Sequence, residues 1–384
     1  MFVYLYSALM LLIYIFSLPL LLLLSLKTKY RQSIPARFFL YKNPPLKSDG
    51  IWFHSCSFGE ARAIEGLVKC LPSDMLRMST TTHTGKEAIS RYTTQSRYLP
   101  FEPLLFGWIK EQKVLVVMEA EFWYLMFFLA KARGAKTMLI NARISDKSYP
   151  KYYKMRWFYK KLFSYVDVVF AQSDTDAKRL KSLGAKDVRV VGNIKLASLP
   201  KLTKELQKSD ALVVCGASTH TNEERVIIEA FLTLKAKRDD AVLLLVPRHP
   251  ERFDEVESLA QEYCDKNNLG YHRYSQNQSL NSDIVVVDVL GELVNLYAIC
   301  DIVILGGAFE SIGGHNAAEA AQFGCKIISG PHYFNQRDIF GAIENIKIAS
   351  AKELGSVLAD YEKLQPTKIT QSVNIKLIVD EIMV

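Results

Sequence analysis

The sequence DIVILGGAFESIGGHNAAE, residues 301–319, decides the fold of the second half of this chain. Its apolar start, residues 301–305, predicts a buried strand, and the Ala-rich run that begins at Ala317 predicts a helix. Between them, four glycines allow positive φ angles and bring backbone N–H groups close to a ligand. The stretch therefore predicts a strand, a glycine loop and a helix, in that order.

The end of this loop suits an anion. The first turn of the expected helix offers unpaired amides and the positive end of the helix dipole, which together favour a phosphate. Glu319 lies three residues after Asn316 on the same side of that helix, so its carboxylate can accept hydrogen bonds from two hydroxyls, such as those of a ribose. The alternative is structural, because Asn316 and Glu319 can form a variant capping box beside a tight loop.

The first 26 residues contain no charged side chain and consist mainly of Leu, Ile, Phe and Tyr. A helix of this length can cross about 30 Å of hydrocarbon. The basic start and small-residue cleavage site of a secretory signal peptide are both missing. Six basic residues follow before the first acidic one, Asp49. We therefore expect a membrane anchor at 1–26, a basic juxtamembrane segment at 27–48, and cytosolic domains beyond it.

Composition narrows the possible partners. The 384 residues are enough for about two domains beside the anchor. A net charge of +8 suits contact with anionic membrane lipids. It would also suit nucleic acid, but no RNA- or DNA-binding motif is present, so we expect no nucleic-acid partner. The six cysteines occur singly, which favours reduced thiols over disulfides or a zinc site.

Strand-like and helix-like runs alternate from Ile51 onward, which predicts parallel sheets with helices on both faces. We expect two Rossmann-like domains, residues 49–196 and 211–384, which face each other across a cleft and are joined by a lysine-rich linker at 197–210. The last helix, within 374–384, is expected to pack back on the first domain. The expected strands are residues 51–54, 75–81, 114–118, 137–140, 166–170, 188–191, 211–215, 241–246, 283–287, 301–305 and 326–328.

Ligands of open parallel sheets bind beyond the carboxyl ends of the strands. Glu60 follows the first strand at the start of a helix, where a carboxylate can act as a general base on a hydroxyl nucleophile. The alternative is an ordinary glutamate stabilised by the helix dipole. Glu119 and Glu121 follow a later strand, and Arg143 follows the next one, where it can hold an anionic group.

The second domain has three further loops of this kind. Ser218, Thr219 and His220 precede an acidic first turn, a pattern that suits capping and phosphate contact equally. Two prolines fix Arg248 and His249 in one geometry that suits a flat base, although the same residues can form a plain loop. The remaining residues of this rim are Pro247, Leu290, Gly291, Glu292 and Leu293.

Two patterns have structural interpretations that we prefer. Residues 174–176 resemble the acidic pair that binds a metal in some sugar-nucleotide transferases, but Ser173 makes them the first turn of a capped helix. With no metal-spaced His or Cys cluster either, we expect no metal and no cofactor. Residues 151–163 mix cations with aromatic residues at helical spacing, which usually means a core helix with a solvated basic face. The alternative is a face that contacts lipid headgroups or an acidic glycolipid.

Taken together, these motifs resemble one family, the 3-deoxy-D-manno-octulosonic acid (Kdo) transferases of lipopolysaccharide synthesis, which are inverting glycosyltransferases of the GT-B fold. The sequence departs from the family's usual motifs at Phe58, at Ala120 and at the pair 317–318. These departures affect what the resemblance implies about the substrate more than what it implies about the type of reaction. The matching motifs occur in the family's order: Ser57-Phe58-Gly59-Glu60, Met118-Glu119-Ala120-Glu121-Phe122-Trp123, Asn141-Ala142-Arg143-Ile144-Ser145, Gly192-Asn193-Ile194-Lys195, Ser218-Thr219-His220 with Glu223 and Glu224, Pro247-Arg248-His249-Pro250-Glu251-Arg252-Phe253, Gly291-Glu292-Leu293, and Gly313-Gly314-His315-Asn316 with Glu319.

The resemblance implies CMP-Kdo as the donor and a lipid A precursor as the acceptor, at the cytosolic face of the inner membrane. Glu60 matches the family's proposed base. The ribose of CMP is implied to lie at Glu319 and the base near Pro247 and Arg248, with residues 290–293 as a further contact. The phosphate is implied to bind at the end of the glycine loop, at Gly313, Gly314, His315, Asn316, Ala317 and Ala318.

Three other functions are compatible with the same fold. A different GT-B transferase would use a UDP-sugar and would release UDP in place of CMP. A UDP-sugar 2-epimerase would act on a soluble donor and would not need residues 1–26. A non-catalytic, membrane-tethered receptor would bind a nucleotide sugar without any turnover.

Overall fold

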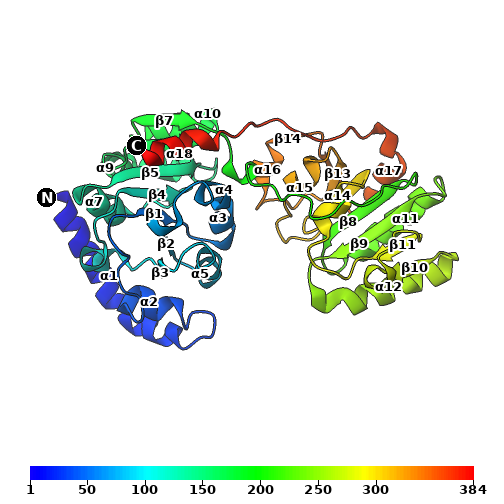
Figure 1. Cartoon of the computed structure of the whole chain (residues 1–384), viewed down its shortest axis with the longest axis horizontal. Coiled ribbons are helices and arrows are strands. Elements are labelled where there is room, and N and C mark those ends of the chain that lie inside the picture. Colours follow the sequence, from blue (N-terminus) through cyan, green and yellow to red (C-terminus); the bar gives the residue numbers. More distant parts are fainter. The chain divides into compact units, whose positions relative to one another are not determined.

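The structure is a computed structural model that describes all 384 residues. By the contacts within the chain it divides into two compact units. Unit 1 comprises Met1–Ser198 and Ser372–Val384, and unit 2 comprises Leu199–Gln371. Each unit contains a seven-stranded, wholly parallel sheet flanked by helices (Figure 1). The predicted fold class, two Rossmann-like parallel-sheet domains, is confirmed.

The sheet of unit 1 has the strand order β3-β2-β1-β4-β5-β6-β7. After β1 the chain builds outward to β3, and it then returns to place β4 on the other side of β1. This reversal between β1 and β4 is the point where ligands bind in open parallel sheets. The strands are β1 Ile51–His54, β2 Leu76–Thr80, β3 Ser96–Tyr98, β4 Val114–Met118, β5 Lys136–Ala142, β6 Val168–Ala171 and β7 Asp187–Val190.

Two hydrophobic cores hold the helices of unit 1 on the two faces of its sheet. Neighbouring residues of a strand point to opposite faces, so Trp52 lies in one core and Phe53 in the other. The last helix, α18 (Ile375–Met383), inserts Ile378 and Ile382 into the second core. The other helices after the first strand are α3 Phe58–Ala63, α4 Glu65–Val68, α5 His83–Ile89, α6 Leu105–Trp108, α7 Tyr124–Ala132, α8 Tyr149–Lys154, α9 Arg156–Phe163 and α10 Asp174–Ser182.

The chain starts with the apolar helix α1 (Phe2–Ser25), which is long and apolar enough to cross a membrane. One side of α1 packs on unit 1, where the Tyr6 hydroxyl donates to the buried Glu102 and the Tyr14 hydroxyl donates to the carbonyl of Phe38 in α2 (Ser33–Phe39). Most of its other side chains, such as those of Leu5 and Phe16, are exposed. The helix therefore exposes a large apolar surface.

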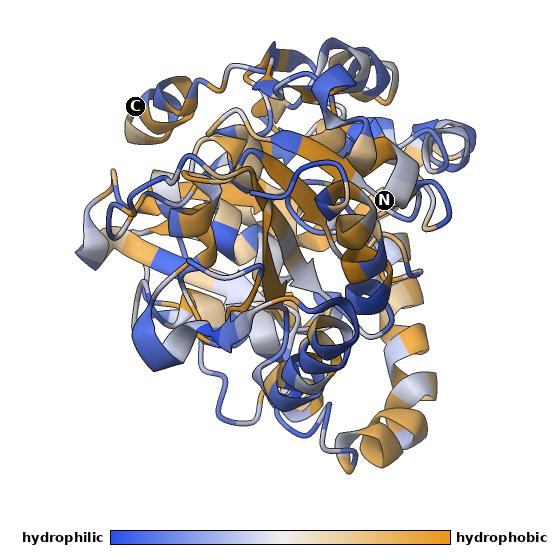
Figure 2. Cartoon of the chain, turned by 90° about the vertical axis from the view of Figure 1, so that its right-hand side faces the viewer, coloured by the Kyte–Doolittle hydropathy of each residue, from blue (hydrophilic) through white to orange (hydrophobic).

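The sheet of unit 2 has the order β10-β11-β9-β8-β12-β13-β15, and it reverses between β8 and β12. Its strands are mainly hydrophobic, whereas the covering helices carry hydrophilic residues on their outer sides (Figure 2). The strands are β8 Val213–Thr219, β9 Val242–Pro247, β10 Tyr271–Arg273, β11 Ile284–Val286, β12 Ile302–Leu305, β13 Lys326–Ser329 and β15 Lys347–Ile348, with a separate pair, β14 Ile343–Glu344 and β16 Lys368–Ile369. The helices are α11 Glu223–Lys235, α12 Phe253–Asn267, α13 Tyr274–Asn277, α14 Leu293–Tyr297, α15 Ala318–Ala321, α16 Arg337–Phe340 and α17 Leu354–Ala359.

Every predicted strand is present, with ends that shift by a few residues. The short strands β3, β10 and β15 were not predicted, because none of them has a long apolar run. The helical pattern of residues 151–163 is divided at Met155 into α8 and α9. The segment expected to be a linker, 197–210, contains the boundary of the two units, between Ser198 and Leu199.

Candidate active site

Glu60 lies in the first turn of α3, directly after β1. The Ser57 hydroxyl caps this helix by accepting a hydrogen bond from the Glu60 amide at 3.3 Å, and it donates one to the Glu60 carboxylate at 3.0 Å. The Cys56 amide donates to the other carboxylate oxygen at 2.7 Å. Glu60 therefore lies at the capped start of a helix, where the structural interpretation expects a glutamate stabilised by the helix dipole.

A capping role does not account for the proton affinity of Glu60. Burial raises the pKa of its carboxyl to about 7, the hydrogen bond from the Cys56 amide opposes this, and the neighbouring carboxylates Glu119 and Glu121 raise it again. A general base works best when its pKa lies near the working pH. The first turn of α3 can thus supply a base at neutral pH.

Glu119 stays ionised because two cations hold it. Lys195 Nζ lies 2.7 Å from one of its carboxylate oxygens, and Arg143 Nε lies 3.3 Å from the other. Burial acts to raise the pKa of Glu119, but Lys195 and Arg143 outweigh it, and the pKa is lowered. Arg143, predicted to hold a substrate anion, is thus also engaged with a carboxylate of unit 1. The sequence does not predict this role of Lys195, because no local pattern indicates that residue 195 contacts residue 119.

His54 and Glu121 form a second pair at the same strand ends, and burial disfavours the charged form of each. Burial lowers the pKa of His54 to about 3, and it raises the pKa of Glu121. His54 Nε2 is buried without a hydrogen-bond partner, 4.0 Å from the Glu121 carboxylate. Glu121 accepts a hydrogen bond from Trp123 Nε1 at 2.8 Å. The sequence does not predict a role for His54 at this site, because a histidine in an apolar strand is more simply interpreted as a core residue.

In unit 2, a buried glutamate holds the glycine loop that follows β12. Glu223, the first residue of α11, is 1% exposed and accepts hydrogen bonds from the amides of Gly307 at 2.8 Å and Phe309 at 3.0 Å. It also accepts one from the His220 amide at 3.0 Å. Gly307 has a φ of +73°, and a Cβ there would lie 2.9 Å from the His315 ring. The carboxylate and the glycine together fix the position of the loop.

The end of this loop carries free hydrogen-bond donors. No hydrogen bond within unit 2 uses the backbone amides of His315, Asn316 and Ala317. Asn316 Nδ2 donates to the Glu319 carboxylate at 3.3 Å, so the predicted capping pair forms. The following helix, α15, has only four residues, so its dipole is smaller than a long helix would give. Three consecutive amides are nevertheless what an anion needs.

Three histidine rings lie together where this run of free amides begins. Nε2 of His220 and Nε2 of His315 are 2.9 Å apart, with the rings stacked at 5.1 Å, and the His249 ring meets His220 edge-on at 5.4 Å. Burial lowers the pKa of His315 to about 4, and His220 and Arg248 add to this effect. The pair is therefore neutral at physiological pH, with one ring N–H donating to the other ring. An anion bound here would stabilise the protonated form.

The remaining predicted residues of unit 2 lie at the same edge of the sheet. Thr219, at the end of β8, donates to Glu224, and its carbonyl accepts from the Arg248 amide at 3.0 Å. Glu292 accepts from Asn295 in α14, a helix that packs against the one carrying Glu319. The other predicted residues lie near strand ends or in this loop: Ser218 is the last residue but one of β8, Pro247 ends β9, Leu290 and Gly291 precede α14, Leu293 begins it, and Gly313, Gly314 and Ala318 belong to the glycine loop and α15.

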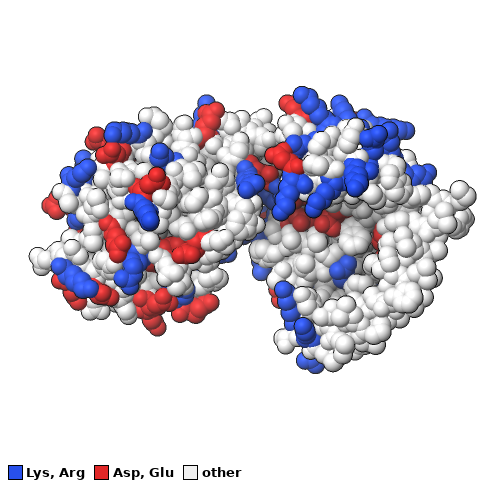
Figure 3. All heavy atoms as spheres, turned by 180° about the vertical axis from the view of Figure 1, so that it is seen from behind, with Lys and Arg blue, Asp and Glu red and all other residues white.

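The two patterns with preferred structural interpretations lie in unit 1. The Ser173 hydroxyl accepts a hydrogen bond from the Asp176 amide at 3.2 Å, so residues 174–176 are a capped first turn. Along α8 and α9, Tyr159 and Phe163 pack against Phe122, whereas the lysines are exposed. Figure 3 shows Lys and Arg side chains gathered over the part of unit 1 where α9 and α10 lie.

Comparison with known proteins places these features in a family. Residues 32–198 match the family model described as 3-deoxy-D-manno-octulosonic-acid transferase (kdotransferase). A 3-deoxy-D-manno-octulosonic acid transferase of Haemophilus influenzae is 32% identical over 369 residues, which cover 89% of this chain and 84% of the relative. The corresponding protein of Bordetella pertussis is 32% identical over 314 residues, which cover 75% of this chain and 72% of the relative.

One solved structure has the same fold at low sequence identity. The crystal structure of UDP-GlcNAc 2-epimerase from Neisseria meningitidis, bound to UDP-GlcNAc, is 10% identical, with a TM-score of 0.54. The match covers 87% of this chain and 99% of that one. At this identity the likeness shows the fold alone.

Proposed function

The chain belongs to the 3-deoxy-D-manno-octulosonic acid transferase family of glycosyltransferases, and from this membership we propose that it transfers Kdo from CMP-Kdo to a lipid A precursor. The observation that carries the proposal is the position of Glu60 beyond the carboxyl end of β1, in the first turn of α3, where burial and the nearby carboxylates raise its pKa to about 7 and so suit a base for a hydroxyl. The apolar helix α1 and the basic segment after it support a site of action at the cytosolic face of the inner membrane, with α1 as a single-pass anchor in contact with membrane lipids.

The reaction proposed for Glu60 is a single displacement with inversion. A hydroxyl of the acceptor gives its proton to the Glu60 carboxylate, and its oxygen attacks the anomeric carbon of Kdo. The bond between that carbon and the phosphate oxygen of CMP breaks, and CMP leaves with the electron pair. Glu119, held by Lys195 and Arg143, keeps a negative charge near Glu60 and so maintains its proton affinity.

The donor is proposed to bind to unit 2. The free amides of residues 315–317, together with His220, His249 and Arg248, suit the CMP phosphate. Donors that are fixed before the reaction stabilise the charge that develops on the leaving phosphate, and they need no metal for this. The ribose is assigned to Glu319, and the base to Pro247 and Arg248 with residues 290–293.

A reconstituted reaction tests this proposal. The purified full chain in detergent is incubated with CMP-Kdo, generated in situ, and a lipid A precursor. We expect CMP release and a product heavier by one or more Kdo residues in the mass spectrum, and Glu60→Gln should lower the rate by about 100-fold or more. Release of UDP from a UDP-sugar, or isomerisation of a UDP-sugar without any acceptor, would instead assign the chain to one of the rival functions.

A further inference from the structure

The apolar helix α1 contacts unit 1 along nearly its whole length, and Figure 1 shows it running along one side of this unit to α2. At its start, the ring of Phe2 lies 5.2 Å from that of Tyr124 in α7. In its middle, the ring of Tyr14 lies 5.9 Å from that of Phe101, and near its end Leu21 is 8% exposed. An α-helix rises about 28 Å over these residues, which nearly equals the thickness of the hydrocarbon core of a bilayer, about 30 Å.

The two sides of α1 differ in chemistry. On the side that contacts unit 1, the Tyr6 hydroxyl donates to Glu102, which is 3% exposed, and the Tyr14 hydroxyl donates to the carbonyl of Phe38. The exposed residues of the helix are Tyr4 and otherwise only Leu, Ile, Phe, Ala and Pro. The inner side needs no charged residue of its own, because unit 1 and not water covers it. One side of α1 therefore suits a protein surface and the other suits lipid.

These contacts do not fit a helix that crosses the bilayer. If α1 crossed with its contacts intact, the part of unit 1 beside it would lie at the depth of the hydrocarbon, including Glu102 and charged residues of α9 such as Lys160. Ionisable side chains are strongly disfavoured there. If α1 left unit 1 in order to cross, Glu102 would lose the Tyr6 hydroxyl, and the rings of Tyr124 and Phe158 would lose their cover. A helix that lies in the membrane surface requires neither change.

Basic residues lie near both ends of α1. Residues 27–31, which follow its last turn, include three exposed basic side chains. At the other end, the ring of Phe2 lies 6.1 Å from that of Trp157 in α9, a helix whose Lys160 and Lys161 are exposed. Trp157 is itself 59% exposed, and tryptophan favours the level of the headgroups. A crossing helix has its basic flank on one side of the membrane only, whereas both ends of a helix in the membrane plane lie among anionic headgroups.

We propose that α1 lies in the plane of the membrane, with its outward side in one leaflet of an anionic bilayer and both of its ends on the cytosolic side. This inference rests on the membrane site in the proposed function. It keeps α1 as the anchor of the protein, and it replaces the single crossing, which the hydropathy of α1 and the basic flank support by themselves. The contacts of α1 with unit 1 and the basic residues at its second end decide between the two orientations.

Cysteine labelling in cells tests where the two ends of α1 lie. A cysteine is added before Met1 through a short Gly-Ser extension, and the exposed Cys70 of unit 1 marks the side on which this unit lies. A maleimide that cannot cross membranes is applied to spheroplasts and to inside-out vesicles, and mass spectrometry locates the label. We expect both thiols to react in inside-out vesicles and neither to react in spheroplasts. The proposal is overturned if the added thiol reacts on the side opposite to Cys70, since α1 would then cross.

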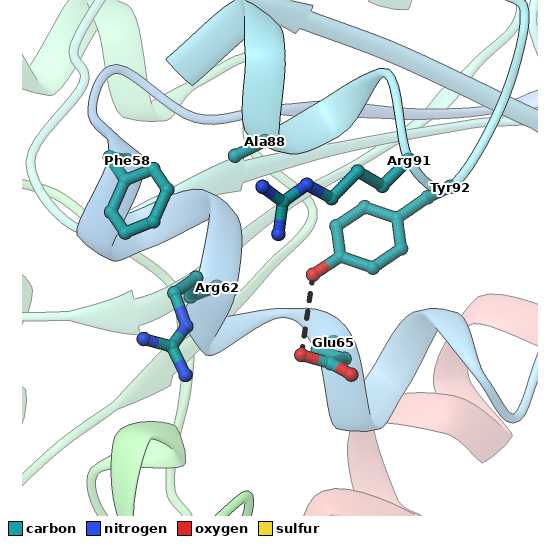
Figure 4. A pocket seen from close by; sticks show the side chains of 6 residues that line it. All are labelled: Phe58, Arg62, Glu65, Ala88, Arg91 and Tyr92. Carbon is teal, nitrogen blue, oxygen red and sulfur yellow. Dashed lines mark hydrogen bonds between the residues drawn. The ribbon is translucent and has the colours of Figure 1, made fainter. Parts of the chain in front are cut away.

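The other face of the sheet in unit 1 provides a control position for a second test. Figure 4 shows Arg91 at a cavity of about 400 Å³, of which Tyr92 also forms part. Tyr92 packs against the core on this face, whereas Phe2 packs against the core on the opposite face. Arg91 is exposed, as Trp157 is. If α1 lies in the membrane plane, Trp157 contacts lipid and residue 91 does not.

Fluorescence quenching measures this difference. The purified full chain is bound to vesicles of phosphatidylcholine and phosphatidylglycerol with brominated acyl chains, which quench tryptophans that contact them. We expect Trp157→Phe to remove about half of the quenching or more, because tryptophan at the headgroup level contacts lipid, whereas Trp52 and Trp108 are buried. The control, Trp157→Phe with Arg91→Trp, should be quenched no more than Trp157→Phe alone. Equal quenching of the wild type and Trp157→Phe would overturn the proposal.

The two tests separate the failure of this inference from the failure of the proposed function. If the chain stays in the membrane fraction and transfers Kdo, but the added cysteine reacts on the side opposite to Cys70, only the orientation of α1 is wrong. If the chain is recovered in the soluble fraction and brominated lipids do not quench it, the proposed membrane site and this inference both fail. If it transfers no Kdo, the labelling and the quenching still decide how α1 meets the membrane.

Discussion

The carboxyl group of Glu60 is held by contacts that act on its pKa in opposite directions. Burial and the carboxylates Glu119 and Glu121 raise it, whereas the hydrogen bonds from Cys56 and Ser57 lower it. Glu60 therefore interacts with the residue that caps its helix, Ser57, and has a pKa close to neutral pH. A half-buried carboxylate of this kind lowers the stability of the folded protein when it is charged. Active-site residues often carry such a cost in stability.

Replacing Glu60 by Gln should stabilise the protein at neutral pH. The folded state raises the pKa of Glu60 from 4.5 to about 7, so the contribution of this group to stability is present below pH 4.5 and is lost as the pH rises through 7. Glu60→Gln avoids this loss, and its side-chain oxygen can still accept the hydrogen bond from the Cys56 amide. We expect a gain of about 1–2 kcal/mol at pH 8, discounted for solvent screening, and none at pH 4. Urea denaturation at both pH values measures this, and a loss of stability at pH 8 would contradict it.

Replacing Glu119 by Gln should shift the pH dependence of the reaction. The change removes a negative charge near Glu60 while the positive charge of Lys195 remains, and both effects lower the pKa of Glu60. The acid limb of the kcat/KM profile should therefore move to lower pH by about 1 pH unit. The same profile for Glu87→Gln, an exposed change on α5, should match the wild type. An acid limb that stays in place or moves to higher pH would contradict the role given to Glu119.

At the scale of elements, the glycine loop is defined by a contact over a long sequence distance. Glu223 at the start of α11 accepts hydrogen bonds from amides that lie more than 80 residues later in the chain. From the sequence alone, a glutamate that caps a helix cannot be distinguished from one that holds a remote loop. The sequence therefore predicts the loop and its donors, but not the residue that fixes them.

Replacing Glu223 by Gln should loosen the loop. The new NH₂ group would face backbone N–H donors, so at least one charge-assisted hydrogen bond is lost in a buried site. We expect unit 2 to lose about 2–3 kcal/mol of stability and the KM for CMP-Kdo to rise about 10-fold. Hydrogen exchange of the peptides around Gly307 and steady-state kinetics measure the two effects. Glu229→Gln, an exposed change on the same helix, is the control and should do neither.

The strands and the functional loops differ in how far the sequence predicts them. Apolar runs such as residues 114–118 predict buried strands, because few other structures bury every residue of a run. The residues that follow those strands could be predicted to lie near a ligand, because the carboxyl ends of parallel strands meet at one edge of the sheet. The ion pairs of Glu119, the orphaned ring nitrogen of His54 and the stacked pair of His220 and His315 depend on packing between remote segments, so no local pattern indicates them.

At the scale of the whole molecule, unit 1 is assembled from both ends of the chain. Helix α18 returns to unit 1 and closes the core on one face of its sheet (Figure 1). Its residue Glu381 forms ion pairs with Lys136 at 2.5 Å and Arg189 at 2.6 Å. The basic residues that follow α1 belong to the same unit. The apolar helix α1 and the proposed base therefore belong to one unit, and the proposed donor site belongs to the other.

Replacing Ile378 by Ala should destabilise unit 1 selectively. Ile378 is fully buried, and deleting three methyl or methylene groups from a core costs about 2–5 kcal/mol. Leu377→Ala is a matched control on the same helix, since Leu377 is 44% exposed and its loss should cost less than about 0.5 kcal/mol. Hydrogen exchange should rise across the sheet of unit 1 in the first variant and remain unchanged in unit 2. Equal effects of the two changes would show that α18 contributes nothing through its buried face.

The return of α18 has a consequence for biosynthesis. Residues 372–384 leave the ribosome after every residue of unit 2, so the nascent chain can complete the fold of unit 2 while unit 1 still lacks a part of its core. Many multidomain chains acquire structure from the amino terminus onward, whereas unit 1 is begun first and is completed only by residues that follow unit 2. Until α18 is available, the core of unit 1 lacks Ile378 and Ile382, so we expect the newly made amino-terminal half to need protection from aggregation, for example by chaperones.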